Sequence, residues 1–166
     1  MTTLADAAAQ ADALAEEGSE RELSQLRAQW DDELEAQART ADFRERAVAY
    51  RAIGQFRFRT KKELLRRGLE DDSPAVRGSA LLALEKLSRD HPGDVNEVRP
   101  LLHELVTHDG NEAVRRLAVL ALKNGSSRAD TIQILASLGE SDEQPRELRD
   151  AAAKVAQLLR RKGNTR

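Results

Sequence analysis

The chain of 166 residues contains no cysteine, and only 3 % of its residues are aromatic. The lack of cysteine excludes a disulfide framework and thiolate chemistry. No apolar run approaches the roughly 20 residues that span a bilayer. The first twenty residues have neither the basic start nor the apolar stretch of a secretory signal. We therefore expect a cytoplasmic protein without a membrane partner.

The abundant residues are Ala, Leu, Glu and Arg, which are strong helix formers, so composition predicts an all-α fold. Apolar spacing and turn residues predict nine helices. Pro100 must either kink the sixth helix or delay its start to Arg99. The predicted helices cover roughly residues 3–17, 19–39, 42–55, 60–70, 73–89, 94–108, 111–124, 127–139 and 144–162.

Five pairs of residues have the spacing of a capping box, in which two side chains satisfy free backbone N–H groups at a helix start. These pairs predict the starts of five helices. They are Thr3 with Asp6, Ser19 with Glu22, Thr60 with Glu63, Asp94 with Glu97, and Ser127 with Asp130.

An internal repeat is the strongest pattern in the sequence. The motif Val-Arg-x-x-Ala-x-x-Ala-Leu occurs at 76–84 and again, without a gap, at 114–122. Weaker copies begin at Leu148 and at Glu45, so that the four motif arginines are Arg46, Arg77, Arg115 and Arg149. Small alanines at fixed positions allow neighbouring helices to pack closely. Acidic turns before the arginines predict a ladder of Asp–Arg pairs between successive repeats.

This motif, following an acidic turn that contains proline, resembles the HEAT repeat, in the short prokaryotic form also found in bilin-lyase accessory proteins. The resemblance implies a right-handed α-solenoid of about four helical hairpins over residues 42–162, with the second helices lining a concave face. It also implies a non-enzymatic scaffold or adaptor that presents this face to another protein. Bilin-lyase accessory and DNA-base-excision activities occur on related repeats, but the features that either needs have no counterpart here, above all the aromatic and acidic cleft of the base-excision enzymes.

Residues 1–41 lack the repeat and predict an acidic helical hairpin. This hairpin is expected either to cap the array, because solenoids need a polar end, or to dock onto a partner with Trp30 as the anchor. Residues 163–166 form a predicted basic tail. The oligomeric state stays open.

Charge changes sign sharply near residue 42, with a net −8 over residues 1–42 and +7 over residues 43–67. The basic segment at 57–67 is the candidate partner-binding patch. It is able to hold phosphates of a nucleic acid, which is the alternative function. The favoured interpretation is that the acidic hairpin neutralises this segment from within the fold. The candidate residues are Arg57, Phe58, Arg59, Lys62, Arg66 and Arg67.

No catalytic, metal-binding or cofactor-binding residues are predicted, and we expect no enzyme activity. His103 and His108 resemble the paired histidines of zinc-protease helices, but they are five residues apart rather than four. They therefore diverge by about 140° around a helix and are poorly placed to share one ion. His103 is expected at the surface. The glycines form no phosphate-binding loop.

Overall fold

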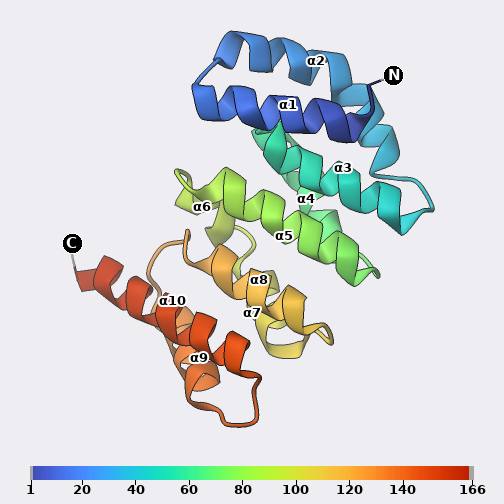
Figure 1. Cartoon of the computed structure of the whole chain (residues 1–166). Helices are drawn as coiled ribbons and strands as arrows, with labels where there is room; N and C mark the ends of the chain where they lie inside the picture. The colour runs from blue at the N-terminus through green and yellow to red at the C-terminus, as the bar shows by residue number, and fades with distance from the viewer. Residues whose placement is uncertain (1, 165–166) are drawn as a thin grey trace. The chain divides into compact units, whose positions relative to one another are not determined.

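The computed structural model describes residues 2–164 and confirms the all-α fold, with helical hairpins of the α-solenoid type (Figure 1). These residues contain no strand. Their helices are α1 (Leu4–Glu17), α2 (Glu20–Gln37), α3 (Phe43–Gln55), the 3₁₀ helix η1 (Arg59–Lys61), α4 (Lys62–Leu69), α5 (Pro74–Ser88), α6 (Pro92–Asn96), α7 (Arg99–His108), α8 (Glu112–Leu122), α9 (Ala129–Glu140) and α10 (Arg146–Asn164).

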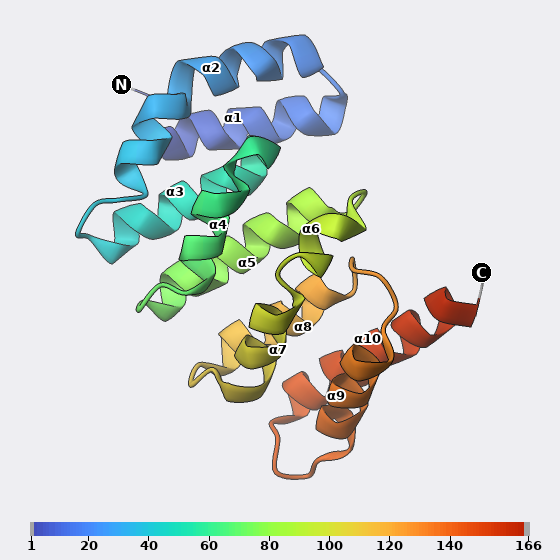
Figure 2. The same ribbon diagram turned by 180° about the vertical axis from the view of Figure 1, so that it is seen from behind.

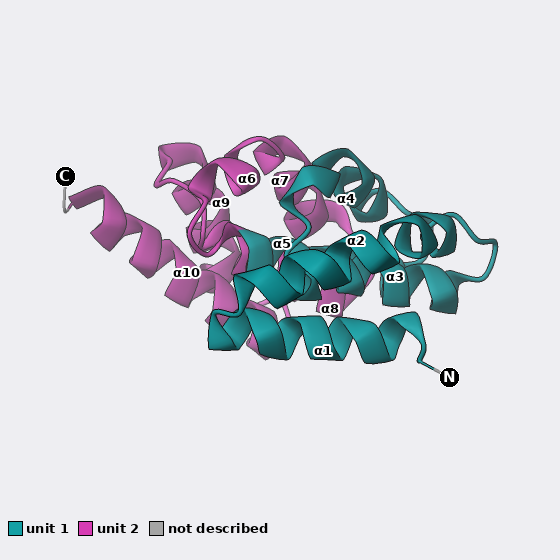
Figure 3. Ribbon diagram, turned by 90° about the horizontal axis from the view of Figure 1, so that it is seen from above, with its two compact units in different colours: residues 1–87 teal, residues 88–166 magenta. Residues whose placement is uncertain are grey.

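The chain divides into two compact units, Met1–Leu87 and Ser88–Arg166 (Figure 3). In unit 1, α1, α3 and α5 follow one another in one layer, α2 lies beside α1 and α3, and α4 lies behind α3 and α5 (Figures 1 and 2). In unit 2, α8 and α10 lie side by side, with α7 and α9 behind them. The repeated motif therefore marks one layer in each unit, formed by α3 and α5 or by α8 and α10.

The predicted sixth helix is two helices, α6 and α7. Pro100 is the second residue of α7, where its missing N–H breaks no intrahelical hydrogen bond. Of the two outcomes predicted for Pro100, the start at Arg99 is confirmed. Pro92 likewise begins α6, so Asp94 lies inside that helix rather than capping it.

Only one of the five predicted capping boxes is present. The Thr3 hydroxyl accepts from the Asp6 N–H at 3.2 Å, and the Asp6 carboxylate accepts from the Thr3 N–H at 3.1 Å. Ser19 caps without a side-chain hydrogen bond, Thr60 lies within η1, and the Ser127 hydroxyl donates instead to the Leu159 carbonyl. The capping-box spacing alone therefore does not predict a cap, because a tertiary hydrogen bond can engage the same side chain.

The motif alanines are buried, as the repeat predicts. Ala80 and Ala83 of α5, Ala118 and Ala121 of α8, and Ala152 of α10 are at most 1 % exposed. Their small side chains bring helices together, while branched residues such as Val76, Leu81, Leu122 and Leu148 fill the remaining core.

Helix α10 extends to Asn164, whereas Thr165 and Arg166 of the predicted basic tail lie outside the described residues. The division predicted from sequence, at 1–41, 42–162 and 163–166, stays a prediction. Within residues 2–164, every helix is too short or too polar to cross a membrane.

Candidate partner-binding surfaces

The structure separates the predicted basic patch into an inward and an outward part. Arg57 is half-buried, Phe58 is buried, and Arg59 is half-buried in η1. Phe58 packs on Phe56, with ring centroids 5.4 Å apart. The predicted patch residues of α4, which are Lys62, Arg66 and Arg67, are by contrast exposed. The segment 57–67 is therefore not one continuous outward surface.

Arg57 joins the basic segment to α1. Its guanidinium donates to the Asp12 carboxylate at 2.7 Å, to Glu16 at 3.1 Å, and to the Gly54 carbonyl at 2.9 Å. Its backbone adopts φ 57°, in the left-handed region that non-glycine residues rarely occupy. The side-chain contacts offset the cost of this conformation, because they tie the turn after α3 to the N-terminal hairpin.

Lys61 was not among the predicted site residues, yet it makes the closest contact between the acidic hairpin and the basic segment. It is 8 % exposed, and its Nζ donates to Asp31 at 2.5 Å and to Glu35 at 2.8 Å, both on α2. Burial alone would lower the pKa of Lys61, but the hydrogen bonds to the two carboxylates outweigh it and raise that pKa. The signal in the sequence was the pair of acids four residues apart on one face of α2.

Asp12 is a second point where the charges of unit 1 cancel. It accepts from Lys86 of α5 at 2.8 Å as well as from Arg57. Partial burial would raise the pKa of Asp12, but these two hydrogen bonds lower it below its usual value. The sequence left open whether the charge step faces inward or outward, and at Arg57, Lys61 and Asp12 it faces inward.

The outward part of the patch consists of Lys62, Arg66 and Arg67 on α4. Acidic residues lie among them, since Glu63 is exposed on the same helix and Glu70 is 3.8 Å from Arg66. This is a mixed rather than a uniformly basic surface.

Trp30, the candidate docking anchor, is 8 % exposed and belongs to the buried face of α2 together with Leu23 and Leu34. Its indole contributes to the core of unit 1.

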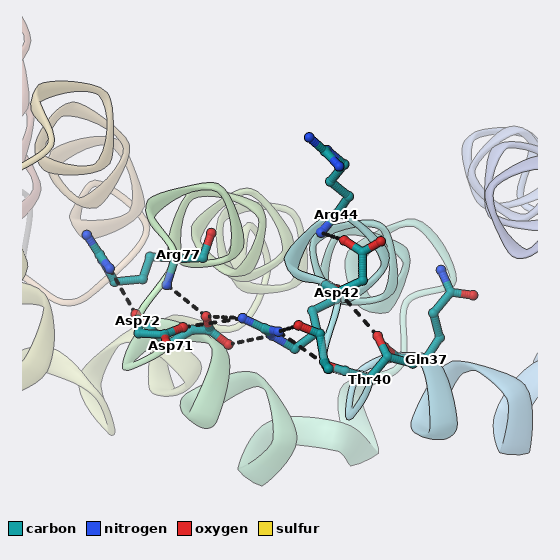
Figure 4. Close-up of polar contacts among 10 residues, drawn as sticks. Gln37, Thr40, Asp42, Arg44, Asp71, Asp72 and Arg77 are labelled. Carbon is teal, nitrogen blue, oxygen red and sulfur yellow. Dashed lines mark hydrogen bonds and ion pairs between the residues drawn. The ribbon is translucent and has the colours of Figure 1, made fainter.

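The first motif arginine, Arg46, holds the turn that precedes the next motif helix, and Figure 4 labels Asp71 and Asp72 of that turn. Arg46 donates from Nε and from one terminal nitrogen to the two carboxylate oxygens of Asp71, at 3.1 and 3.0 Å, and also to the carbonyls of Thr40 and Ala41. Burial would raise the pKa of Asp71, but the Arg46 hydrogen bond and the Ser73 N–H lower it. This contact is the Asp–Arg rung that the repeat predicts.

In unit 2 the motif arginines bind turns through different partners. Arg115 donates to the Val106 carbonyl at 2.8 Å and to the Gln144 side chain at 2.9 Å, and Arg149 lies 3.5 Å from Asp142. A neutral glutamine thus occupies the position that an aspartate holds in unit 1. Arg115 is structural, because its donors are engaged by turns of the fold, whereas the buried Nε of Arg149 has no hydrogen-bond partner.

A polar cluster lies between α7 and α9. Arg99 is 5 % exposed and donates to the Thr131 hydroxyl at 3.1 Å and to Asn96. His103 Nε2 lies 2.9 Å from the same hydroxyl and is half-buried, so the expectation of a surface histidine was wrong. Burial lowers the pKa values of both Arg99 and His103. Within residues 2–164, no group of three or more acidic or histidine side chains is arranged to hold a metal ion.

A groove runs between the two motif helices of unit 2, and sequence reasoning did not identify it. It has a volume of about 650 Å³ and continues at Arg116 and Glu147 into a smaller hollow beside Asn111. Leu158, 46 % exposed, lies on it. The signal in the sequence was that Leu158 falls off the stripe of α10 that contains Val155 and Leu159. The lining residues are Arg116, Leu120, Lys123, Glu147, Asp150, Ala151, Lys154, Val155 and Leu158.

Comparison with known proteins supports the repeat but gives no individual relative. Residues 32–96, from the middle of α2 to the end of α6, match the family model described as HEAT repeats. The chain matches no curated protein and no solved structure. The matched residues contain the first two motif helices, α3 and α5, together with the Arg46–Asp71 pair. The resemblance read from the repeated motif is confirmed over residues 32–96, which match HEAT repeats within an all-helical chain.

Proposed function

We propose that the chain is a non-enzymatic adaptor that binds partner proteins through the exposed side of its motif helices. HEAT repeats commonly act as protein-interaction scaffolds, and the family is typically non-enzymatic. The fold supports this use, because each motif helix buries one face in its unit and leaves the other available for contact.

The proposal rests on the location of the large apolar side chains that remain exposed. Among the described residues they are Phe43 and Val48 of α3, Leu82 of α5 and Leu158 of α10. All four belong to motif helices, whereas the large apolar residues of the other described helices are buried or half-buried. Exposed apolar side chains that gather on particular elements are typical of protein-binding surfaces.

The test is affinity capture of the full chain from its native host, followed by reconstitution of the complex from purified components. We expect a stoichiometric protein partner that binds the wild-type chain and is lost from the triple variant Val48→Glu, Leu82→Glu, Leu158→Glu. These side chains are 36, 40 and 46 % exposed, so the variant should retain its helical circular dichroism. A complex that survives the triple substitution would contradict the adaptor proposal.

A matched variant distinguishes the alternative function, phosphate or nucleic-acid binding through the segment 57–67. Exposed Arg66 and Arg67 on α4, with Lys62, favour that alternative. Under it, binding is lost from Lys62→Glu, Arg66→Glu, Arg67→Glu and weakens steeply between about 50 and 200 mM salt. The adaptor proposal expects the α4 variant to keep its partner. Arg57 is excluded from the variant, because its contacts with α1 support the fold.

A further inference from the structure

The groove between α8 and α10 combines an apolar floor with an ordered arrangement of charge. Helix α8 contributes Arg116, Leu120 and Lys123, which are spaced four and three residues apart and therefore form one stripe. Figure 1 shows α8 and α10 side by side, with their N-terminal ends at the same end of the pair. All of the lining residues belong to unit 2, so the groove is complete within it.

The floor is large enough to receive side chains of another helix. Leu120 is half-buried, Val155 is buried, and Leu158 is 46 % exposed. Ala151 between them is small, which leaves the hollow of about 650 Å³. A partner side chain seated there would remove Leu158 from water, and this burial is the driving force for association.

The charges change sign along the groove. At the N-terminal ends of the two helices, the lining residues Glu112, Glu147 and Asp150 provide three carboxylates, while Arg116 is the one lining guanidinium and the exposed Arg146 lies 3.8 Å from Asp150. Further along, the charged lining residues are Lys123 on α8 and Lys154 on α10. The groove is thus acidic at one end and basic at the other. The apolar residues Leu120, Ala151, Val155 and Leu158 line the floor alongside these charges.

We propose that this groove binds an amphipathic helix of a partner protein, which lies antiparallel to α8 and α10. The inference rests on the adaptor function proposed above and specifies the chemistry of its partner. Helices favour acidic residues in their first turn and basic residues in their last turn, because of the helix dipole. In the antiparallel orientation, the acidic first turn meets Lys123 and Lys154, and the basic last turn meets Glu112, Glu147 and Asp150. Apolar residues three and four apart on the partner contact Leu120 and Leu158.

Two labelled peptides of identical composition test the orientation and the charge pattern. Each has 14 residues with three leucines spaced three and four apart. The matched peptide has two glutamates in its first turn and two lysines in its last turn, and the exchanged peptide has them reversed. Fluorescence anisotropy with the full chain should give at least about tenfold tighter binding of the matched peptide at low salt. Because the exchanged peptide is a poorer helix, both are closed by the same central hydrocarbon staple, and their helicity is checked by circular dichroism.

Variants of the chain assign the binding to the groove. Leu158→Glu should abolish binding of the matched peptide, while Phe43→Glu, which changes an equally exposed apolar residue outside the groove, should leave it unchanged. The double variant Asp150→Lys, Lys154→Glu leaves equal numbers of acidic and basic lining residues at each end of the groove, so it should still bind both peptides but no longer prefer either of them. Its effect on specificity cannot be reproduced by a loss of folding.

Three results would overturn the proposal: equal binding of the two peptides, binding that persists in Leu158→Glu, or a dimer of the chain that Leu158→Glu dissociates. The last result would make a second copy of the chain the occupant of the groove. The same experiments distinguish a failure of the groove proposal from a failure of the adaptor proposal. If the native partner is lost from Val48→Glu, Leu82→Glu but retained by Leu158→Glu, the adaptor stands and the groove has been wrongly assigned.

Discussion

At the scale of single residues, Gly54 determines how closely α3 approaches α5. A Cβ added at Gly54 would lie 2.6 Å from the Cα of Ala83, and a backbone atom cannot move aside as a flexible side chain can. Gly54→Ala should therefore destabilise the protein by about 1–3 kcal/mol through overpacking, although alanine is the better helix former. Urea unfolding measures the change.

Gly93→Ala is the matched control, because Gly93 is also helical but has no atom within 4 Å of an added Cβ. It should be neutral or slightly stabilising. A Gly54→Ala protein as stable as the wild type would show that α3 and α5 can separate without cost.

Asp71 makes a pH-dependent contribution through its bidentate contact with Arg46. Its pKa is lowered in the folded state, so its stabilisation is present above the ordinary aspartate pKa and is lost as pH falls through the folded value. Asp71→Asn should cost about 1–2 kcal/mol at pH 7 and progressively less toward pH 2. Denaturant unfolding across this range measures the difference from wild type.

Asp72→Asn makes the same chemical change at the adjacent residue, whose side chain is 94 % exposed. It should have little effect at any pH. If Asp71→Asn and Asp72→Asn behave alike, the Arg46–Asp71 pair does not stabilise the turn.

At the scale of elements, Asp12 links α1 to the rest of unit 1, because it accepts from both Arg57 and Lys86. Asp12→Lys places three cations together and should loosen the N-terminal hairpin. Hydrogen exchange of α1 amides should become about tenfold faster or more, while the amides of α5 change less. Glu17→Lys makes an identical charge change at an exposed residue of α1 and should leave exchange nearly unchanged.

The order and boundaries of most elements could be predicted from the sequence, because the apolar period and the repeat depend on local spacing. The Arg46–Asp71 rung was also predictable, since an acidic turn precedes the next motif. The capping pairs were less predictable from the sequence. Ser127 fits a capping box, yet its hydroxyl donates to Leu159, a residue 32 positions away that no local pattern identifies.

The candidate site was less predictable than the fold, for a related reason. A run of basic residues does not reveal which of them face acids elsewhere. Arg57 and Lys61 turn toward α1 and α2, whereas Arg66 and Arg67 turn outward, and only the packing of the hairpins decides between these outcomes. The α8–α10 groove depends on which leucine each helix leaves unburied.

At the scale of the whole molecule, the two units should respond to acid in different pH ranges. In unit 2, burial lowers the pKa of His103, so the unfolded state binds a proton at a higher pH than the folded state does. Unit 2 should lose stability as pH falls below about 6.5, the ordinary histidine value, toward the folded pKa. In unit 1, Asp12, Glu35 and Asp71 have lowered pKa values, and their stabilisation is lost only below the ordinary carboxylate range.

His103→Gln tests this separation, because glutamine keeps a polar group near the Thr131 hydroxyl but does not titrate. The only tryptophan, Trp30, reports unit 1 by fluorescence, whereas far-ultraviolet circular dichroism reports both units. Between pH 7 and 5.5, the wild type should lose stability by circular dichroism, and His103→Gln should lose clearly less. An identical pH dependence of the two proteins would mean that the His103 imidazole is protonated in the folded state as readily as in the unfolded chain. The carboxylates would then account for the whole acid response.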